Sequence, residues 1–179
     1  MKNARKLPLM AMLVVTLTSG LASQAAAAPP PHAGPAAADL IPFKGTLEGR
    51  HISRAPVTPP IVFDRFEISG EATQLGHFEL VIEATVDFGS RPVIGAGTFM
   101  FTAANGDQLV ANHTGFSTLV APGSVLITEH AMIDPDRSTG RFAGAAGSFS
   151  VERLADAATG VGGLTAGTFE GTISLRGAH

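Results

Sequence analysis

Glu129 is the residue whose type and surroundings best suit acid–base chemistry. In the segment 125–133, alternation places Glu129 on the same strand face as Val125, Ile127, Ala131 and Ile133. A carboxylate buried among such side chains has a raised pKa and can act as a general acid or base. Two other arrangements fit the same pattern. In one, this face points outward near a rim, and in the other, Glu129 pairs with an arginine.

Asn112 and His113 are the next candidates, because they are adjacent on the preceding strand and point to opposite faces. Which of the two faces the interior depends on the turn at Asn105-Gly106. A two-residue type I′ turn would pair Phe99 with Asn112 and place Asn112 inside. A three-residue loop with a bulge would pair Phe99 with His113 and place His113 inside. Both alternatives are open at this point.

Among Phe, Tyr and Trp, the chain contains only phenylalanine, with eleven Phe and neither Trp nor Tyr. Such a composition suits an apolar interior, because a phenylalanine ring has no polar group. It also makes a carbohydrate-binding site less expected, since many such sites stack sugars on Trp or Tyr. Phe78, Phe99 and Phe101 are candidates to line a cavity for an apolar ligand. They would serve equally well as a packed core, because an eight-stranded barrel is either filled by side chains or leaves space for one ligand.

Motifs for the common cofactors, nucleophiles and metals are missing from the chain. There is no hydrolase elbow, P-loop or metal-binding pattern. The closest pair of histidines, His113 and His130, is 17 residues apart, so a metal site would have to be assembled across strands. We therefore predict no cofactor and no metal. Arg141 and Arg153 are interpreted as surface partners of acidic neighbours.

The period of the apolar residues predicts an all-β protein. Apolar residues recur at every second position, and turn residues separate the segments. Strand-interior glycines such as Gly97 and Gly171 favour strong coiling. We expect a single closed or nearly closed antiparallel β-barrel of about eight strands, with a β-sandwich as the alternative. The expected strands cover residues 41–52, 61–73, 76–88, 95–103, 108–116, 125–133, 149–154 and 167–175.

The N-terminal residues have the composition of an export signal. Lys2, Arg5 and Lys6 precede an apolar run over 7–17, and Ala25-Ala26-Ala27 offers a small-residue cleavage pattern. We predict a signal peptide over 1–27, a Pro/Ala-rich leader over 28–38 and a barrel domain over 39–179. An uncleaved anchor is the alternative, but the apolar run is short for a spanning helix. The expected location is secreted or periplasmic, with no membrane span after cleavage.

Charge limits the partners of such an exported chain. Removing the signal removes three of twelve basic residues and none of fifteen acidic ones, which leaves nine against fifteen and a net charge of −6. An acidic chain without a Lys/Arg cluster argues against nucleic acid and anionic lipid as partners. With no cysteine, the folded core must be stable without disulfides.

Three Gly-rich motifs carry a resemblance to known proteins. They are GEATQLGHF at 70–78, GTFMFTAANGD at 97–107 and TGRFAGAAGSF at 139–149. In this order they resemble a group of exported bacterial proteins of unassigned function. The last motif is also similar to elements of the barrels of allene oxide cyclases and dirigent proteins. The second resemblance implies an eight-stranded barrel with an apolar cavity, and it carries over no active-site residue.

Two functions are compatible with these observations. The first is a non-enzymatic exported barrel that binds a small apolar ligand or acts as an interaction module. The second is an isomerase or cyclase of the allene oxide cyclase or dirigent type, which would hold an apolar intermediate in the lumen. Assembly into a dimer or trimer is a further possibility, with Val81, Val110 and Met132 as candidates for an exposed apolar face.

Overall fold

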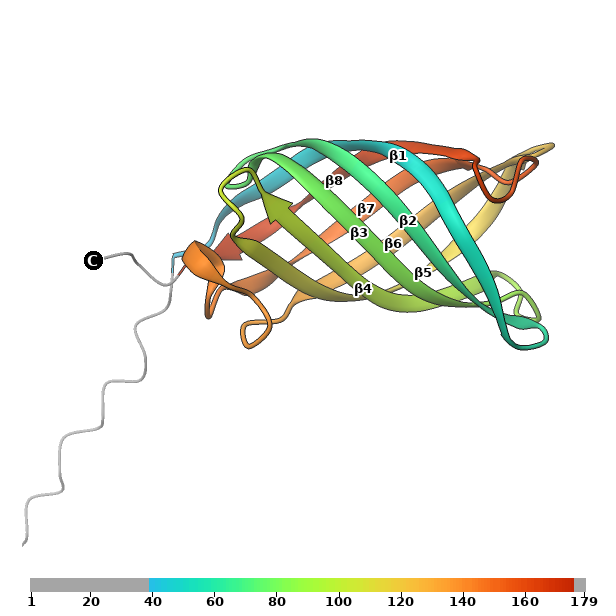
Figure 1. Ribbon diagram of the computed structural model, residues 1–179, viewed down its shortest axis with the longest axis horizontal. Coiled ribbons are helices and arrows are strands. Elements are labelled where there is room, and N and C mark those ends of the chain that lie inside the picture. Colours follow the sequence, from blue (N-terminus) through green and yellow to red (C-terminus); the bar gives the residue numbers. More distant parts are fainter. Residues whose placement is uncertain (1–38, 176–179) are drawn as a thin grey trace, which may run out of the picture. The chain divides into compact units, whose positions relative to one another are not determined.

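The computed structural model describes residues 39–175, which form a closed antiparallel β-barrel of eight strands (Figure 1). Each strand pairs with the next in the sequence, and β8 pairs back with β1. The strands are β1 (Ile41–Thr58), β2 (Ile61–Ala72), β3 (Gly76–Asp87), β4 (Val93–Ala103), β5 (Gln108–Ala121), β6 (Ser124–Ile133), β7 (Ala146–Asp156) and β8 (Leu164–Ser174). The predicted barrel is confirmed, and the sandwich is not formed. The predicted signal peptide and leader lie outside the described residues.

Several strands are longer than the sequence indicated. β1 continues past residue 52 to Thr58, and Pro56 within it faces Val62 of β2. Register shifts between His51 and Ser53 and between Pro56 and Thr58 accommodate this extension. The expectation that this strand covers only residues 41–52 was therefore wrong, because β-bulges let a strand continue with an irregular ladder.

The β4–β5 connection decides which residues face the interior. It is a three-residue loop, 104–106, in which Gly106 N–H donates to the Ala103 carbonyl (2.8 Å) and Ala103 N–H donates to the Asp107 carbonyl (2.9 Å). Gly106 has φ +87°, which suits the left-handed residue that closes such a loop. The resulting register pairs Phe99 with Ala111, so neither pairing expected from the sequence is the one formed.

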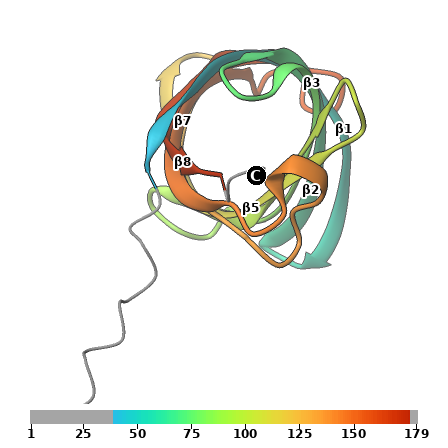
Figure 2. The same cartoon turned by 90° about the vertical axis from the view of Figure 1, so that its left-hand side faces the viewer.

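One end of the barrel is covered by the β6–β7 connection, which contains the 3₁₀-helix η1 (Gly140–Phe142). Figure 2 views the barrel from this end. Phe142 of η1 is fully buried and belongs to the core. Ser138 Oγ in the same connection accepts a hydrogen bond from Val110 N–H (3.1 Å). Val110 is consequently buried, so its expected place on an exposed apolar face was wrong.

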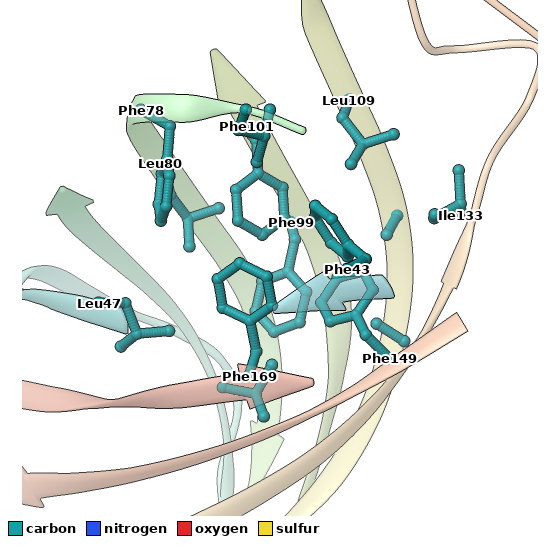
Figure 3. Close-up of a cluster of buried hydrophobic side chains, with 14 of the residues drawn as sticks. Phe43, Leu47, Phe78, Leu80, Phe99, Phe101, Leu109, Ile133, Phe149 and Phe169 are labelled. Carbon is teal, nitrogen blue, oxygen red and sulfur yellow. The ribbon is translucent and has the colours of Figure 1, made fainter. Parts of the chain in front are cut away.

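The core occupies the half of the barrel next to η1. Six phenylalanine rings from five strands meet there with centroid separations of 5.0 to 6.2 Å (Figure 3). All six are almost completely buried. Edge-to-face and tilted arrangements of this kind add to the stabilisation that comes from burying the rings. The six are Phe43, Phe78, Phe99, Phe101, Phe149 and Phe169.

Candidate functional site

The other half of the barrel interior contains a cavity of about 190 Å³. On β4 the inward positions change from Phe99 and Phe101 to Gly95 and Gly97, and on β3 they change from phenylalanine to Ala84. Small side chains at these levels leave space that the rings fill at the opposite end. The remaining apolar lining includes Phe66, Val86, Val125, Ile127 and Ala155.

The cavity reaches the surface at the end opposite η1. Its outer lining belongs to strand ends and to the β7–β8 connection, where Leu164 and Ala157 are exposed. Exposed large apolar side chains surround this end of the barrel. They are Val57, Phe63, Phe88, Ile94, Phe116, Leu119, Val120, Leu154, Val161 and Leu164. We call this ring of residues the apolar rim.

A buried set of three polar residues forms one wall of the cavity. Arg153 donates from Nε to Glu129 Oε2 (3.0 Å) and from Nη2 to Glu129 Oε1 (3.1 Å). His113 lies beside this pair, with Nδ1 3.6 Å from Glu129 Oε1. The register of three neighbouring strands brings these residues together. Gly115 of β5 pairs with Glu129 of β6, and Ile127 of β6 pairs with Arg153 of β7. We refer to His113, Glu129 and Arg153 as the inner set.

His113 is the unsatisfied member of the inner set. It is 96% buried, and neither ring nitrogen has a hydrogen-bond partner among residues 39–175. Its ring is stacked on Phe99 with a centroid distance of 4.2 Å and an interplanar angle of 10°. A buried polar group without a partner costs stability. Such a group in a cavity wall is a candidate for contact with a ligand.

The surroundings of His113 lower its pKa. Burial is the largest influence, and it disfavours the charged ring. The Glu129 carboxylate raises the pKa and the Arg153 guanidinium lowers it. The nearby backbone carbonyl of Glu83 also raises the pKa, without forming a hydrogen bond to either ring nitrogen. His113 is therefore neutral at neutral pH, with one nitrogen able to donate and the other able to accept.

A second histidine–carboxylate–arginine set lies nearer the apolar rim. Arg54 donates from Nε and Nη2 to the two oxygens of Asp64, both at 2.7 Å. His51 Nε2 lies 3.3 Å from Asp64 Oδ1 and donates to the Ser53 carbonyl at 2.9 Å. Its hydrogen bond with Asp64 raises the pKa of Arg54. His51, Asp64 and Arg54 are the outer set.

Phe66 joins the two sets. The His51 and Phe66 rings are stacked with their centroids 4.7 Å apart. The Arg153 guanidinium carbon lies 4.7 Å from the centroid of the Phe66 ring. A cation over an aromatic face is attracted by the ring quadrupole. Phe66 therefore contacts both sets, the outer set through His51 and the inner set through Arg153.

The structure places the sequence-predicted site residues in different environments. Glu129 faces the interior and pairs with an arginine, so the outward alternative was wrong. His113 faces the interior as well. Asn112 is exposed and its amide donates to Asp134 (3.3 Å), so the alternative that placed Asn112 in the lumen was wrong. The reason is the three-residue β4–β5 loop, which fixes the register.

Phe78, Phe99 and Phe101 lie inside the barrel but do not line the cavity. Their rings pack against one another and against the other phenylalanines of the core. The structure thus corrects the expectation that these three side chains would line a ligand site. Phe99 contributes indirectly, because the His113 ring rests on it.

Sequence reasoning missed Arg153, His51 and Asp64. Arg153 was interpreted as a surface residue, yet its side chain is only 3% exposed. A signal was present, because Arg153 continues the alternation of Phe149 and Val151. Asp64 likewise shares a face with Phe66. A charged residue within an inward alternation indicates a buried pair, although the alternation does not identify its partner.

Comparisons with protein-family models, curated proteins and solved structures give no match to this chain. Within 39–175, no group of three or more His, Asp or Glu is placed to hold a metal ion. In the same range, no helix is long and apolar enough to cross a membrane.

Proposed function

We propose that this protein is an exported barrel that reversibly binds one small, uncharged, mostly apolar molecule bearing a hydroxyl or carbonyl group. The observation that carries the proposal is the unpartnered, buried His113 in the wall of a cavity with mostly apolar lining. The apolar part of the ligand would contact the lining, and its polar group would bond to His113. Export rests on the predicted signal over 1–27.

Charge pairing in the site supports an uncharged ligand. Arg153 is paired with Glu129 and Arg54 with Asp64, in each case through two hydrogen bonds. Bringing an unpaired charge into such a site carries a large desolvation cost. Neutral His113 offers one donor and one acceptor, which suits a hydroxyl group especially well because a hydroxyl both donates and accepts.

The size of the cavity supports a ligand of about one ring. An engineered dry cavity of roughly 150 Å³ in another protein takes up benzene. The cavity here is somewhat larger, at about 190 Å³. Substituted phenols and cyclic alcohols or ketones have suitable dimensions. The apolar rim would favour the approach of such molecules from water.

Native mass spectrometry of the protein purified from its own host tests this proposal. We expect a co-purifying small molecule, or saturable binding of phenol when it is added. The matched variants are His113→Phe, which removes the hydrogen-bonding ring, and His130→Phe on the exposed outer face. Phenol binding should weaken at least tenfold in His113→Phe, which corresponds to about 1.4 kcal/mol, and should be unchanged in His130→Phe.

A clean mass without bound molecule, together with no saturable uptake of phenol, cyclohexanol or benzene, would contradict the proposal. Equal phenol binding by the wild-type protein and His113→Phe would contradict the assignment of His113 as the polar contact.

A further inference from the structure

We propose that the inner set catalyses proton transfer at the carbon next to a carbonyl group, with small cyclic ketones as the substrate class. This inference rests on the proposed function, since the substrate must occupy the same cavity. Three roles are needed for such a reaction: a base for the carbon-bound proton, a group that stabilises the protonated base, and a donor for the carbonyl oxygen. The inner set contains one residue for each role.

His113 is the base. Both ring nitrogens are free of partners within the described part of the chain, so one of them has a lone pair available for the substrate. Stacking on Phe99 fixes the plane of the ring. Its lowered pKa keeps the ring unprotonated at neutral pH, as a base requires.

Glu129 is a positioning residue. Its Oε1 lies 3.6 Å from His113 Nδ1, so its charge stabilises the imidazolium that forms when His113 accepts a proton. The two hydrogen bonds from Arg153 fix the orientation of this carboxylate. Glu129 thus acts through His113 and not on the substrate.

Arg153 supplies the donor for the carbonyl oxygen. Its Nε and Nη2 are used by Glu129, whereas Nη1 makes one long contact of 3.4 Å with Thr165 Oγ1. Nη1 carries two hydrogens, so one of them is left for a substrate oxygen. Arg153 lines the cavity beside His113. A positive donor at this place would stabilise the negative charge that develops on the oxygen.

The reaction balances without any further reactant. In a β,γ-unsaturated ketone, His113 removes a proton from the α-carbon, and the electron pair of that C–H bond forms a new carbon–carbon double bond. The carbonyl π electrons move to oxygen and give a dienolate that is held by Arg153. The imidazolium then returns the proton to the γ-carbon while the carbonyl re-forms. The product is the conjugated α,β-unsaturated ketone.

The outer set differs from the inner set in that its histidine is bonded to the backbone at the cavity mouth. His51 Nε2 is already used as a donor to the Ser53 carbonyl, and the Asp64 carboxylate is 3.3 Å from that same nitrogen. His51 also holds the β7–β8 connection, because its backbone N–H donates to the Gly163 carbonyl (2.9 Å). We therefore assign the outer set to shaping the cavity mouth.

The test is the conversion of 3-cyclohexen-1-one to 2-cyclohexen-1-one, followed by ultraviolet absorbance, with the protein purified from its host. We expect a rate at least about 100-fold above that of free imidazole at equal concentration. His113→Gln should lose most of this rate while still binding cyclohexanone. The matched control His130→Gln changes an exposed histidine on the outer face and should keep the rate.

A second readout separates a catalytic from a structural role of His113. The wild-type rate should fall as the pH decreases through the lowered pKa of His113, because protonation removes the base. In heavy water, cyclohexanone should gain deuterium at its α-carbons under the same pH dependence. A purely structural His113 would give neither result.

The outcomes distinguish the two proposals. Binding of cyclohexanone with no rate above free imidazole would overturn the catalytic inference and leave the proposed function intact. If phenol, cyclohexanone and 3-cyclohexen-1-one all fail to bind, the proposed function and the catalytic inference are both overturned. A rate that is retained in His113→Gln would overturn the assignment of the base.

Discussion

The two halves of the barrel interior are built from the same eight strands with the same alternation, yet one is filled and the other contains a cavity. On β4, Phe99 and Phe101 face the filled half, whereas Gly95 lines the cavity. Alternation alone therefore tells which residues point inward. Whether the interior is filled depends on how side-chain size changes along the inward positions of each strand.

The two halves of the interior also differ in the polarity of their buried side chains. The buried Asp, Glu, Arg and His side chains of residues 39–175 all line the cavity, whereas the half next to η1 is a cluster of phenylalanine and aliphatic groups. The packed half thus stabilises the fold, and it allows the other half to contain paired charges and an unpartnered histidine. Unsatisfied polar groups and reduced packing are typical of sites whose arrangement serves function at some cost in stability.

The largest effect is expected in the packed half. Phe101→Ala should lower the free energy of unfolding by about 3–5 kcal/mol, because it removes a fully buried ring that contacts several others. Phe116→Ala is the matched variant, since Phe116 is 44% exposed at the rim and should cost less than about 1 kcal/mol. Denaturant unfolding measures both, and equal losses would contradict the division into a packed and an open half.

The next largest effect is expected for the buried ion pair. Arg153→Met leaves the Glu129 carboxylate buried without its partner and should cost about 3 kcal/mol, at the lower end of the usual range because the pair borders a cavity that water can enter. The double variant Arg153→Met with Glu129→Leu should recover most of this loss. A double variant that loses at least as much stability as Arg153→Met alone would contradict this explanation, because removing the unpaired carboxylate would then have brought no recovery.

A smaller effect, on binding rather than stability, is expected at Gly95. A Cβ added there meets nothing closer than 3.6 Å, so the backbone tolerates a side chain that projects into the cavity. Gly95→Val should weaken phenol binding at least tenfold, or about 1.4 kcal/mol. Its stability should stay within about 1 kcal/mol of wild type. Ala96→Val, one residue along and facing outward, is the control. Unchanged binding in Gly95→Val would mean that phenol binds elsewhere.

The smallest effect is a pH dependence of stability. The pKa of His113 is lowered in the folded protein below its ordinary value of 6.5, so on acidification the unfolded chain gains a proton before the folded chain does. The free energy of unfolding should therefore decrease as the pH falls from 6.5 to the lowered pKa. Unfolding at about pH 7.5 and about pH 5.5 in wild type and His113→Gln isolates this contribution. An identical pH dependence in both would contradict the lowered pKa.

The fold was predictable because alternation and turn residues are local signals. The strand Gly76–Asp87, with Phe78, Leu80 and Ile82 on one face, is formed as expected. The site was predictable only in part. Glu129 was identified from its aliphatic neighbours, but the choice between Asn112 and His113 depended on a single residue of loop length after Ala103.

Arg153 shows what the sequence could not provide. Its place in the alternation after Phe149 and Val151 indicates an inward side chain, but a partner on a neighbouring strand is known only once the register is fixed. The inward positions of β4 change from glycine at 95 and 97 to phenylalanine at 99 and 101. This change in side-chain size was visible in the sequence and would have indicated a partly open lumen. Interpreting strand glycines only as sites of coiling hid that signal.

A titration of the histidine ring resonances with phenol, followed by NMR, tests the central claim most directly. The account predicts that the His113 ring of the wild-type protein is neutral at pH about 7 and shifts saturably as phenol binds, while the exposed His130 ring does not respond. A saturable shift should be lost in Gly95→Val. A His113 ring that is unaffected by phenol would contradict the account, as would equal, non-saturating shifts of both histidines.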